Sequence, residues 1–367
     1  MKKILQIYSI IIVITSFAAC KTQNRTDQLK KKNKEVVTLN NIYPIKKADT
    51  IQSTNAPSKI TRKIRKDLKG NLLFAAYKNI IKYDGVSFTN IKTQESIASY
   101  DAFDVWQDKN ETIWVASTHF GVFQYPKSTV LKANKKSFNH FTTKNGLAHN
   151  RTMCIYEDMA GGIWVGTEGG ISYFNGKTPP NKQIITRNFT VKNGLTSNSI
   201  NTILEDKTGK IWVGTRGTLV IYNPLSKLNS NKVSFTEVTD YKGKTFKNIW
   251  AILEDKNGTI WLGGQYGLWR YSGNSFTKLA STNITAIYED TKENIWFTHG
   301  ASNNQKAGLS RYNKKSLLNK KPKATQIFSD NGMLFGINED KNNAIWVGKL
   351  NGVFRYSEKS VSFFKNN

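Results

Sequence analysis

Short apolar runs alternate with polar turns along most of the chain, and one such unit recurs. In one copy, "SINTILED" (Ser199–Asp206) is followed by the polar "KTGK", by "IWVGT" (Ile211–Thr215) and by "LVIYN" (Leu219–Asn223). After another turn comes "KVSFTEV" (Lys232–Val238). Runs of strand length between turn residues predict four β-strands in each unit. No stretch after residue 60 combines the 3.6-residue period with the length of an amphipathic helix, so a helical solenoid is not expected.

The tryptophan of the second run marks the copies of this unit. It falls at Trp114, Trp164, Trp212, Trp261, Trp296 and Trp346, with steps of 48 to 50 residues except for one step of 35. A seventh, degenerate copy, "KDLKGNLLFAA" (Lys66–Ala76), has Leu73 in the tryptophan place. Four short strands per repeat of this length are typical of a propeller. We therefore predict an all-β fold, a seven-bladed β-propeller with four antiparallel strands per blade.

A Glu-Asp pair precedes the turn between the first two strands of most units. We expect Asp158, Asp206 and Asp255 to accept hydrogen bonds from backbone N–H groups across their turns. Gly161, Gly209 and Gly258 are expected to supply the positive φ that such a turn requires. The tryptophan that follows is expected to pack against the neighbouring blade. Because the pair recurs around the ring, we interpret it as structural rather than catalytic.

The first 19 residues have the pattern of an export signal, with Lys2 and Lys3 before an apolar run. "SFAAC" resembles the lipobox of bacterial lipoproteins, which implies cleavage before Cys20 and lipid attachment to it. Residues 20–59 then form a basic flexible linker, and residues 60–367 form the propeller. Lys21–Lys66 holds thirteen Lys or Arg and three Asp or Glu. A solvated tether without a partner and an arm that binds headgroups both remain open.

The formal net charge of the chain is +28. Such a surface favours anionic neighbours such as lipid headgroups or acidic glycans, and for an exported protein it is no sign of specific nucleic-acid binding. The second cysteine, Cys154, lies in the apolar run "TMCIY" and is expected to be a buried, inert thiol. The spacing of a zinc, phosphate-binding or nucleophile-elbow motif is missing from the sequence, so no cofactor, metal or catalytic residue is predicted.

Two units carry a family resemblance. "KNGLAHNRTMCIYEDMAGGIWVGTEGGISYFNG" (Lys144–Gly176) and "KNGLTSNSINTILEDKTGKIWVGTRGTLVIYN" (Lys192–Asn223) resemble the two-component-regulator propeller repeat, which is typical of periplasmic sensor regions in Bacteroidetes-type bacteria. The resemblance covers residues 60–367. It implies a β-propeller that binds a small, often glycan-derived ligand, here without the kinase that such sensors carry.

The resemblance implies that a ligand meets the face that carries the loops between blades. Residues on that face that break the repeat are free of the blade-building role. The candidates for ligand binding are Tyr77, His119, His149, Arg151, Glu168, Arg216, Trp250, Gln265, His299 and Lys349. Acidic, basic, amide and aromatic groups would suit a small polar or anionic ligand. A metal site of His119, His149, His299 and Glu168 is disfavoured, because these residues come from separated blades.

We therefore expect a lipid-anchored propeller of the cell envelope, on the outer or inner membrane, that binds a ligand or an envelope protein. The alternative is a lyase or hydrolase that uses His119, Glu168 and His299, since "ENIWFTHG" (Glu293–Gly300) resembles the repeats of streptogramin lyase. The run "VSFF" (Val361–Phe364) is expected to complete blade seven, and ring closure then depends on packing between blades seven and one.

Overall fold

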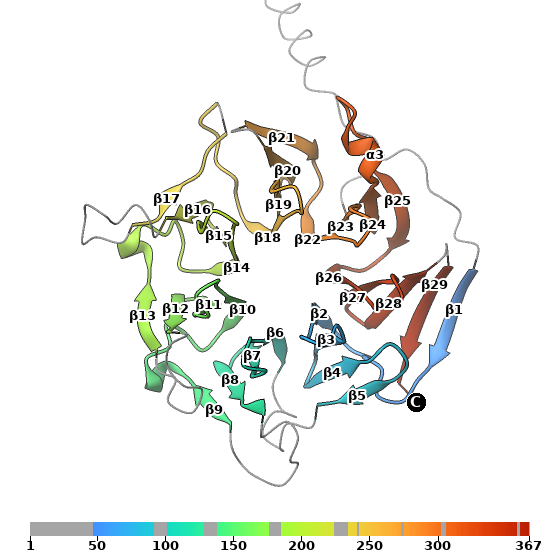
Figure 1. Cartoon of the computed structure of the whole chain (residues 1–367), viewed down its shortest axis with the longest axis horizontal. Helices are drawn as coiled ribbons and strands as arrows, with labels where there is room; N and C mark the ends of the chain where they lie inside the picture. Colours follow the sequence, from blue (N-terminus) through green and yellow to red (C-terminus); the bar gives the residue numbers. More distant parts are fainter. Residues whose placement is uncertain are drawn as a thin grey trace, which may run out of the picture. The chain divides into compact units, whose positions relative to one another are not determined.

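Seven sheets form the folded body in the computed structural model (Figure 1): six have four antiparallel strands, and the seventh has four antiparallel strands and one parallel strand. The structure describes residues 47–91, 101–127, 138–175, 185–223, 234–240, 242–272, 275–301, 306–357 and 360–366. Each sheet contains a blade of four strands that follow one another in chain order, with the first of the four nearest the centre of the ring. The predicted fold class and the number of blades are confirmed.

The blades take their strands from consecutive stretches of the chain. Blade one has β2 (Thr61–Lys66), β3 (Leu72–Ala76), β4 (Asn79–Tyr83) and β5 (Phe88–Asn90), and blade two has β6 (Ala102–Gln107), β7 (Ile113–Ser117), β8 (Val122–Tyr125) and β9 (Asn139–Phe141). Blade three has β10 (Thr152–Glu157), β11 (Ile163–Thr167), β12 (Gly170–Phe174) and β13 (Ile185–Phe189), and blade four has β14 (Ile200–Glu205), β15 (Ile211–Thr215), β16 (Leu219–Tyr222) and β17 (Thr236–Glu237).

The remaining blades follow the same order. Blade five has β18 (Ile249–Glu254), β19 (Ile260–Gly264), β20 (Gly267–Ser272) and β21 (Ser275–Ala280), and blade six has β22 (Ile284–Glu289), β23 (Ile295–His299), β24 (Ala307–Tyr312) and β25 (Thr325–Asp330). Blade seven has β26 (Leu334–Glu339), β27 (Ile345–Lys349), β28 (Gly352–Ser357) and β29 (Ser360–Lys365). Short helical turns lie between strands: η1 (Thr143–Asn145), η3 (Val191–Asn193) and α3 (Lys314–Leu317).

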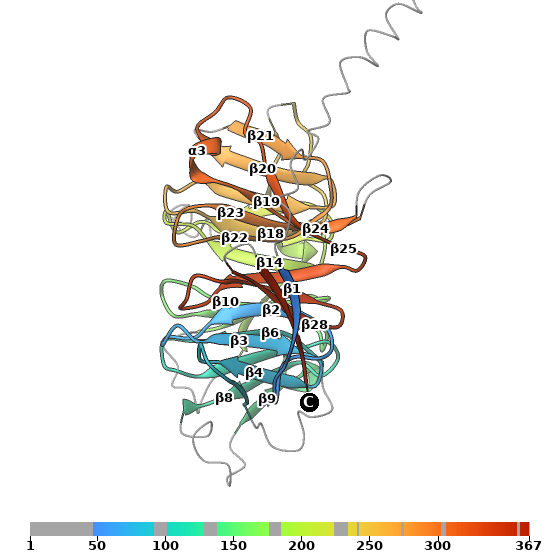
Figure 2. The same ribbon diagram turned by 90° about the vertical axis from the view of Figure 1, so that its right-hand side faces the viewer.

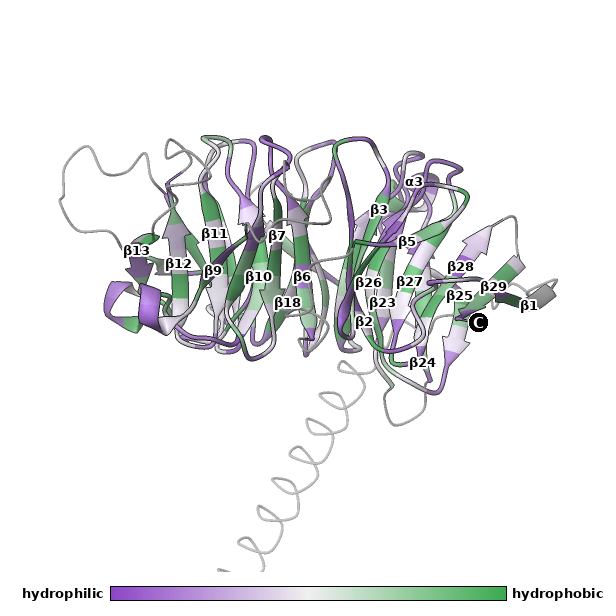
Figure 3. Cartoon of the chain, turned by 90° about the horizontal axis from the view of Figure 1, so that it is seen from below, coloured by the Kyte–Doolittle hydropathy of each residue, from purple (hydrophilic) through white to green (hydrophobic). Residues whose placement is uncertain are grey.

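The hydrophobic core lies between adjacent blades. Trp164 of blade three packs with Ile203 and Val213 of blade four, and Trp346 of blade seven packs with Leu72 and Phe74 of blade one. Figure 3 shows hydrophobic colour along many strands and hydrophilic colour on many of the turns. Each tryptophan therefore joins its own sheet to the next one, as the sequence predicted.

The aspartate of each repeat holds both its turn and its tryptophan. In blade four, Asp206 Oδ1 accepts hydrogen bonds from the backbone N–H groups of Thr208 (2.9 Å) and Lys210 (3.0 Å). Asp206 Oδ2 accepts one from the indole N–H of Trp212 (2.6 Å). Five other blades repeat this bond with the pairs Asp108–Trp114, Asp158–Trp164, Asp255–Trp261, Asp290–Trp296 and Asp340–Trp346. In blade one the side-chain amide of Asn71 donates to Asp67 instead, because the side chain of Leu73 has no N–H group.

The glutamate before each aspartate links neighbouring blades. Glu205 accepts from the backbone N–H of Met159 in blade three (2.6 Å), and Glu254 accepts from that of Lys207 in blade four (2.9 Å). Glu157, Glu289, Glu339 and Gln107 make the same bond to the turn of the preceding blade. Both acids of the pair are thus structural, and Gly161, Gly209 and Gly258 have the predicted positive φ of 79–83°.

The seam between blades seven and one is built differently. Lys66 of blade one stands where the other blades have Glu or Gln, and Lys341 of blade seven reaches across to Asn71 through its ammonium group (2.7 Å). In addition, β1 (Lys47–Gln52) pairs in parallel with β29 and adds a fifth strand to blade seven. Figure 2 shows this blue strand beside the dark red strands of the chain's end. Residues 47–52 were predicted to belong to the linker, and the structure instead adds them as a strand to the closure expected from packing alone.

Replacing Asp206 with Ala should destabilise the propeller. The buried indole N–H of Trp212 and two backbone N–H groups would lose their acceptor, at a cost of roughly 3 kcal/mol in the free energy of unfolding. Urea denaturation measures this loss. Asp84→Ala is the control, because Asp84 also accepts two backbone N–H groups but in an exposed turn, and its loss should be much smaller. Equal losses would contradict a structural role specific to the aspartate–tryptophan pair.

Deleting β1 should weaken blade seven. A variant lacking residues 1–52 loses the parallel ladder on β29 and the bond from the Ser53 N–H to the Lys365 carbonyl. We expect a loss of roughly 2 kcal/mol in unfolding free energy, since each backbone bond contributes about 0.5–1.5 kcal/mol, and faster amide exchange in β29. A variant lacking residues 1–46 keeps the strand and serves as the control. Identical melting and exchange in the two variants would show that β1 does not hold the seam.

Candidate functional site

The innermost strand of every blade contains a register shift near its start. In blade one, Thr61 pairs with Ala76 and Lys63 pairs with Ala75, so Arg62 is left out of the ladder. The same irregularity separates Ile249 from Ala251 in blade five. It occurs also in β6, β10, β14, β22 and β26. A β-bulge re-aims a side chain and is common beside functional sites.

The bulged residues come together around one cavity of about 450 Å³. One side chain from the bulge of each blade lines it: Arg62, Phe103, Met153, Asn201, Trp250, Thr285 and Phe335. Lys63, Asn248, Gln265, Asn283 and Met333 complete the lining. Because the first strands surround the centre of the ring (Figure 1), this cavity is the mouth of the central channel on the face of the inter-blade loops.

The lining combines three kinds of group. Phe103, Met153, Trp250, Met333 and Phe335 are apolar. Asn201, Asn248, Gln265, Asn283 and Thr285 can donate and accept hydrogen bonds, and the two cations are Arg62 and Lys63. Within the protein, the Asn201 amide donates to Asn248 Oδ1 (3.1 Å) and to the carbonyl of Ile249 (3.1 Å). Apolar and aromatic side chains together with convergent polar groups are the usual composition of a small-molecule site.

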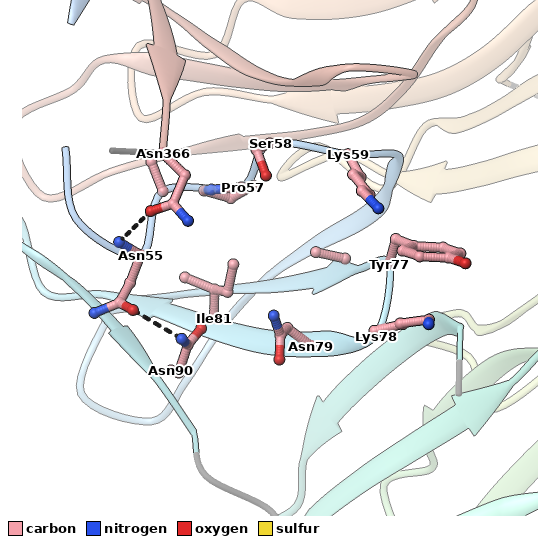
Figure 4. Close-up of a pocket in the computed structure, with 12 residues that line it drawn as sticks. Asn55, Pro57, Ser58, Lys59, Tyr77, Lys78, Asn79, Ile81, Asn90 and Asn366 are labelled. Carbon is pink, nitrogen blue, oxygen red and sulfur yellow. Dashed lines mark hydrogen bonds between the residues drawn. The ribbon is translucent and has the colours of Figure 1, made fainter. Parts of the chain in front are cut away.

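Two of the predicted site residues, Trp250 and Gln265, line this cavity. Tyr77 lines a different and smaller one of about 190 Å³, beside the segment that connects β1 to β2. Figure 4 shows Asn55 there between Asn366 and Asn90, to which it is hydrogen-bonded. The ammonium groups of Lys59 and Lys78 lie 4.9 Å and 5.4 Å from the centre of the Tyr77 ring. Tyr77 therefore belongs to the seam rather than to the channel mouth.

Three other candidates form a surface ion-pair cluster. The carboxylate of Glu168 lies 3.4 Å from Arg151 and 3.4 Å from Arg216. The two arginine side chains are about half exposed, and none of the three residues lines one of the cavities described above. Surface ion pairs of this kind contribute little to stability. The cluster lies at the end of β11 and β15, beside the loops of the channel-mouth face.

The histidines do not converge. His119 and His149 are exposed and do not line the channel mouth. His299 is buried at the end of β23, and burial lowers the pKa of its ring to about 4, so it is neutral at neutral pH. Among the described residues, no group of three or more His, Cys, Asp or Glu could hold a metal ion. Lys349, the last candidate, pairs with Asp330 (2.7 Å) outside the cavity.

Most of the channel mouth was not predicted from the sequence. Arg62, Phe103, Met153, Asn201, Thr285 and Phe335 lie inside strands, whereas the search was confined to loops and to Trp250. A signal was present, because each of these residues stands eleven positions before the repeat's tryptophan or its leucine, as 212 − 201 = 11 shows for blade four. At this position of the repeat, two blades have phenylalanine and the other five blades each have a different residue.

The remaining predictions fall elsewhere in the chain. Cys154 is buried, and burial raises the pKa of its thiol to about 12, which fits an inert side chain. Cys20, the predicted lipidation site, lies outside the described residues. In the part of the chain that the structure describes, no helix has the length and apolar character needed to cross a membrane.

Comparison with solved structures shows the fold. The extracellular domain of a one-component system from B. thetaiotaomicron matches 84% of this chain with a TM-score of 0.61 and 18% identity. That of a hybrid two-component system from the same organism matches 85% with a TM-score of 0.61 and 22% identity. The chain spans 39% and 41% of the length of these two structures. A streptogramin B lyase matches 83% of the chain, over 95% of its own length, with a TM-score of 0.57 and 12% identity.

Comparison with curated proteins found no match. The profile of the two component regulator propeller family matches residues 146–169, 194–217 and 243–266. Each match covers an inter-blade loop, the innermost strand, the Glu-Asp turn and the tryptophan strand, in blades three, four and five. The chain is therefore a β-propeller in which three of the seven blades match the two-component-regulator propeller repeat.

Proposed function

We propose that this protein is a ligand-binding or protein-interaction propeller of the bacterial cell envelope, and that its ligand occupies the channel mouth. One observation carries the proposal: each of the seven blades contributes a bulged side chain to the same cavity. The turns between the first and second strands of the blades contain the same hydrogen bonds around most of the ring, whereas the channel mouth has a mixed set of side chains. Side chains that do not serve the scaffold are available for recognition.

The chemistry of the lining favours a small ligand with both an apolar surface and hydrogen-bonding groups. Trp250, Phe103 and Phe335 offer aromatic surfaces, on which the apolar face of a sugar ring could pack. The amides of Asn248 and Gln265 could bond to hydroxyl groups. A polar or anionic ligand, including one derived from a glycan, fits this description. A segment of an envelope protein that inserts into the mouth would use the same groups.

The envelope location rests on two points. The structures of two-component-type systems that resemble this chain are extracellular domains. The N-terminal sequence has the pattern of a lipoprotein signal that ends at Cys20. We propose that lipid on Cys20 anchors the protein to the outer or inner membrane and that the basic residues before β2 lie near that surface. Specific nucleic-acid binding is no part of the proposal.

The alternative of a lyase or hydrolase stays without a structural observation in its favour. It assigned the chemistry to His119, Glu168 and His299. His299 is buried, Glu168 is paired with two arginines and His119 is exposed. None of the three lines the channel mouth.

Trp250→Ala tests the proposed site. Screening oligosaccharides and organic anions by thermal shift identifies compounds that stabilise the wild-type protein. Removal of this aromatic contact should raise the Kd of such a compound roughly tenfold or more, while the free protein stays folded in thermal melting. Tyr266→Ala is the control, because Tyr266 is an exposed aromatic residue of the same blade outside the cavity. Unchanged affinity in Trp250→Ala would place the binding site elsewhere.

A further inference from the structure

One strand supplies the positive charge of the channel mouth. Arg62 and Lys63 of β2 are the cations in its lining, and no carboxylate is present among the described residues that line it. The side chains on both sides of this strand in the ring are apolar: Phe103 of blade two and Phe335 of blade seven. The charge therefore stands in an apolar wall, where an electrostatic interaction is stronger than in water.

Arg62 is held in place without being neutralised. Its guanidinium carbon lies 5.4 Å from the centre of the Phe103 ring. Its Nη1 atom is buried and has no hydrogen-bond partner in the described part of the chain. Neither Arg62 nor Lys63 forms a salt bridge with a described carboxylate.

Arg65, three residues after Arg62 on the same strand, shows the contrast. It donates to both carboxylate oxygens of Asp104, at 3.0 Å and 2.8 Å. A bidentate pair of this kind satisfies both charges. The strand therefore places one neutralised arginine below the mouth and two cations without a salt bridge in its lining.

An unpaired cation in a partly buried wall carries a desolvation cost. Burial lowers the pKa of Arg62 and of Lys63, and the more distant Asp101 and Asp104 act in the opposite direction. An anion in the cavity would remove that cost and would regain hydrogen bonds for the guanidinium. A neutral ligand would leave it in place.

The opposite side of the mouth has different chemistry. Blades four and five lie opposite blade one in a ring of seven and contribute Asn201 and Trp250, and Asn283 comes from the loop before blade six. Asn201 Oδ1 and Asn283 Oδ1 are buried acceptors without a hydrogen-bond partner among the described groups. These oxygens would accept from hydroxyl or N–H groups on the body of a ligand, and the Trp250 ring would cover its apolar face.

We propose that the channel mouth selects organic anions. A single oxyanion group, a carboxylate, sulfate or phosphate, lies against Arg62 and Lys63, and its uncharged body lies between Phe103 and Trp250. This inference rests on the proposed function, since it assigns the ligand class of the same cavity. It adds that β2 decides between charged and neutral ligands and that Trp250 contributes to the binding of both.

A matched pair of fluorescent probes separates these two statements. 1-Anilinonaphthalene-8-sulfonate carries an oxyanion on an aromatic body, and N-phenyl-1-naphthylamine is its neutral counterpart. Binding of each is titrated to the wild-type protein and to Arg62→Gln, Arg62→Lys, Trp250→Ala and Arg187→Gln. Arg187→Gln removes an exposed charge from the outer strand β13 and is the control for net charge. Thermal melting establishes that each variant is folded.

The expected result is a change that depends on the charge of the probe. Arg62→Gln weakens the anionic probe roughly tenfold or more, because a hydrogen-bonded charge is lost, and leaves the neutral probe unchanged. Arg62→Lys restores part of the affinity, Trp250→Ala weakens both probes, and Arg187→Gln affects neither. If Trp250→Ala weakens both probes but Arg62→Gln weakens neither, or both equally, the anion selectivity is overturned while the proposed site stands. If neither probe depends on Trp250 or Arg62, both proposals fail.

Discussion

A buried tryptophan indole needs a hydrogen-bond acceptor, and the structure supplies it with an aspartate that also holds the adjacent turn. In six blades the aspartate accepts the indole N–H at 2.6–2.9 Å. Each of these tryptophans fills the space between its own blade and the next. One side chain thus fixes the turn, the orientation of the aromatic ring and the contact between blades. Without that acceptor, the large apolar surface of the tryptophan could be buried only with an unsatisfied N–H group.

The double role of this aspartate explains which positions of the repeat can vary. The Glu-Asp turn serves the scaffold in nearly every blade, and its chemistry is accordingly uniform. At the opposite end of each inner strand, the bulge removes one residue from the ladder and directs it to the channel mouth. That residue takes no part in the aspartate–tryptophan bonds, so Arg62, Met153, Asn201 and Trp250 can occupy equivalent positions. A recognition site is therefore built on a rigid ring without weakening the interfaces that close the ring.

The repeat motifs of the sequence were sufficient to predict the seven blades, the turn chemistry of Asp206 and Gly209, and the packing of Trp212. The interactions of each motif involve residues close together in the sequence, and their recurrence in seven copies allows the motif to be recognised. The closing strand β1 was not predicted, because "KADTIQ" is a single polar segment whose partner lies more than 300 residues away. The channel mouth was found only in part, through Trp250 and Gln265. Strand bulges shift side chains by one position, and a reading confined to loops does not see that shift.

The methionines offer a direct test of the account. The chain has four methionines. Met153 and Met333 line the channel mouth, Met159 lies in the turn between β10 and β11 at the opposite end of its blade, and Met1 is the first residue. With methyl-labelled methionine, NMR can follow all of them while a ligand that stabilises the protein is added. The account predicts shifts in the Met153 and Met333 signals and none in that of Met159. A shift of Met159 alone, with Met153 and Met333 unmoved, would contradict it.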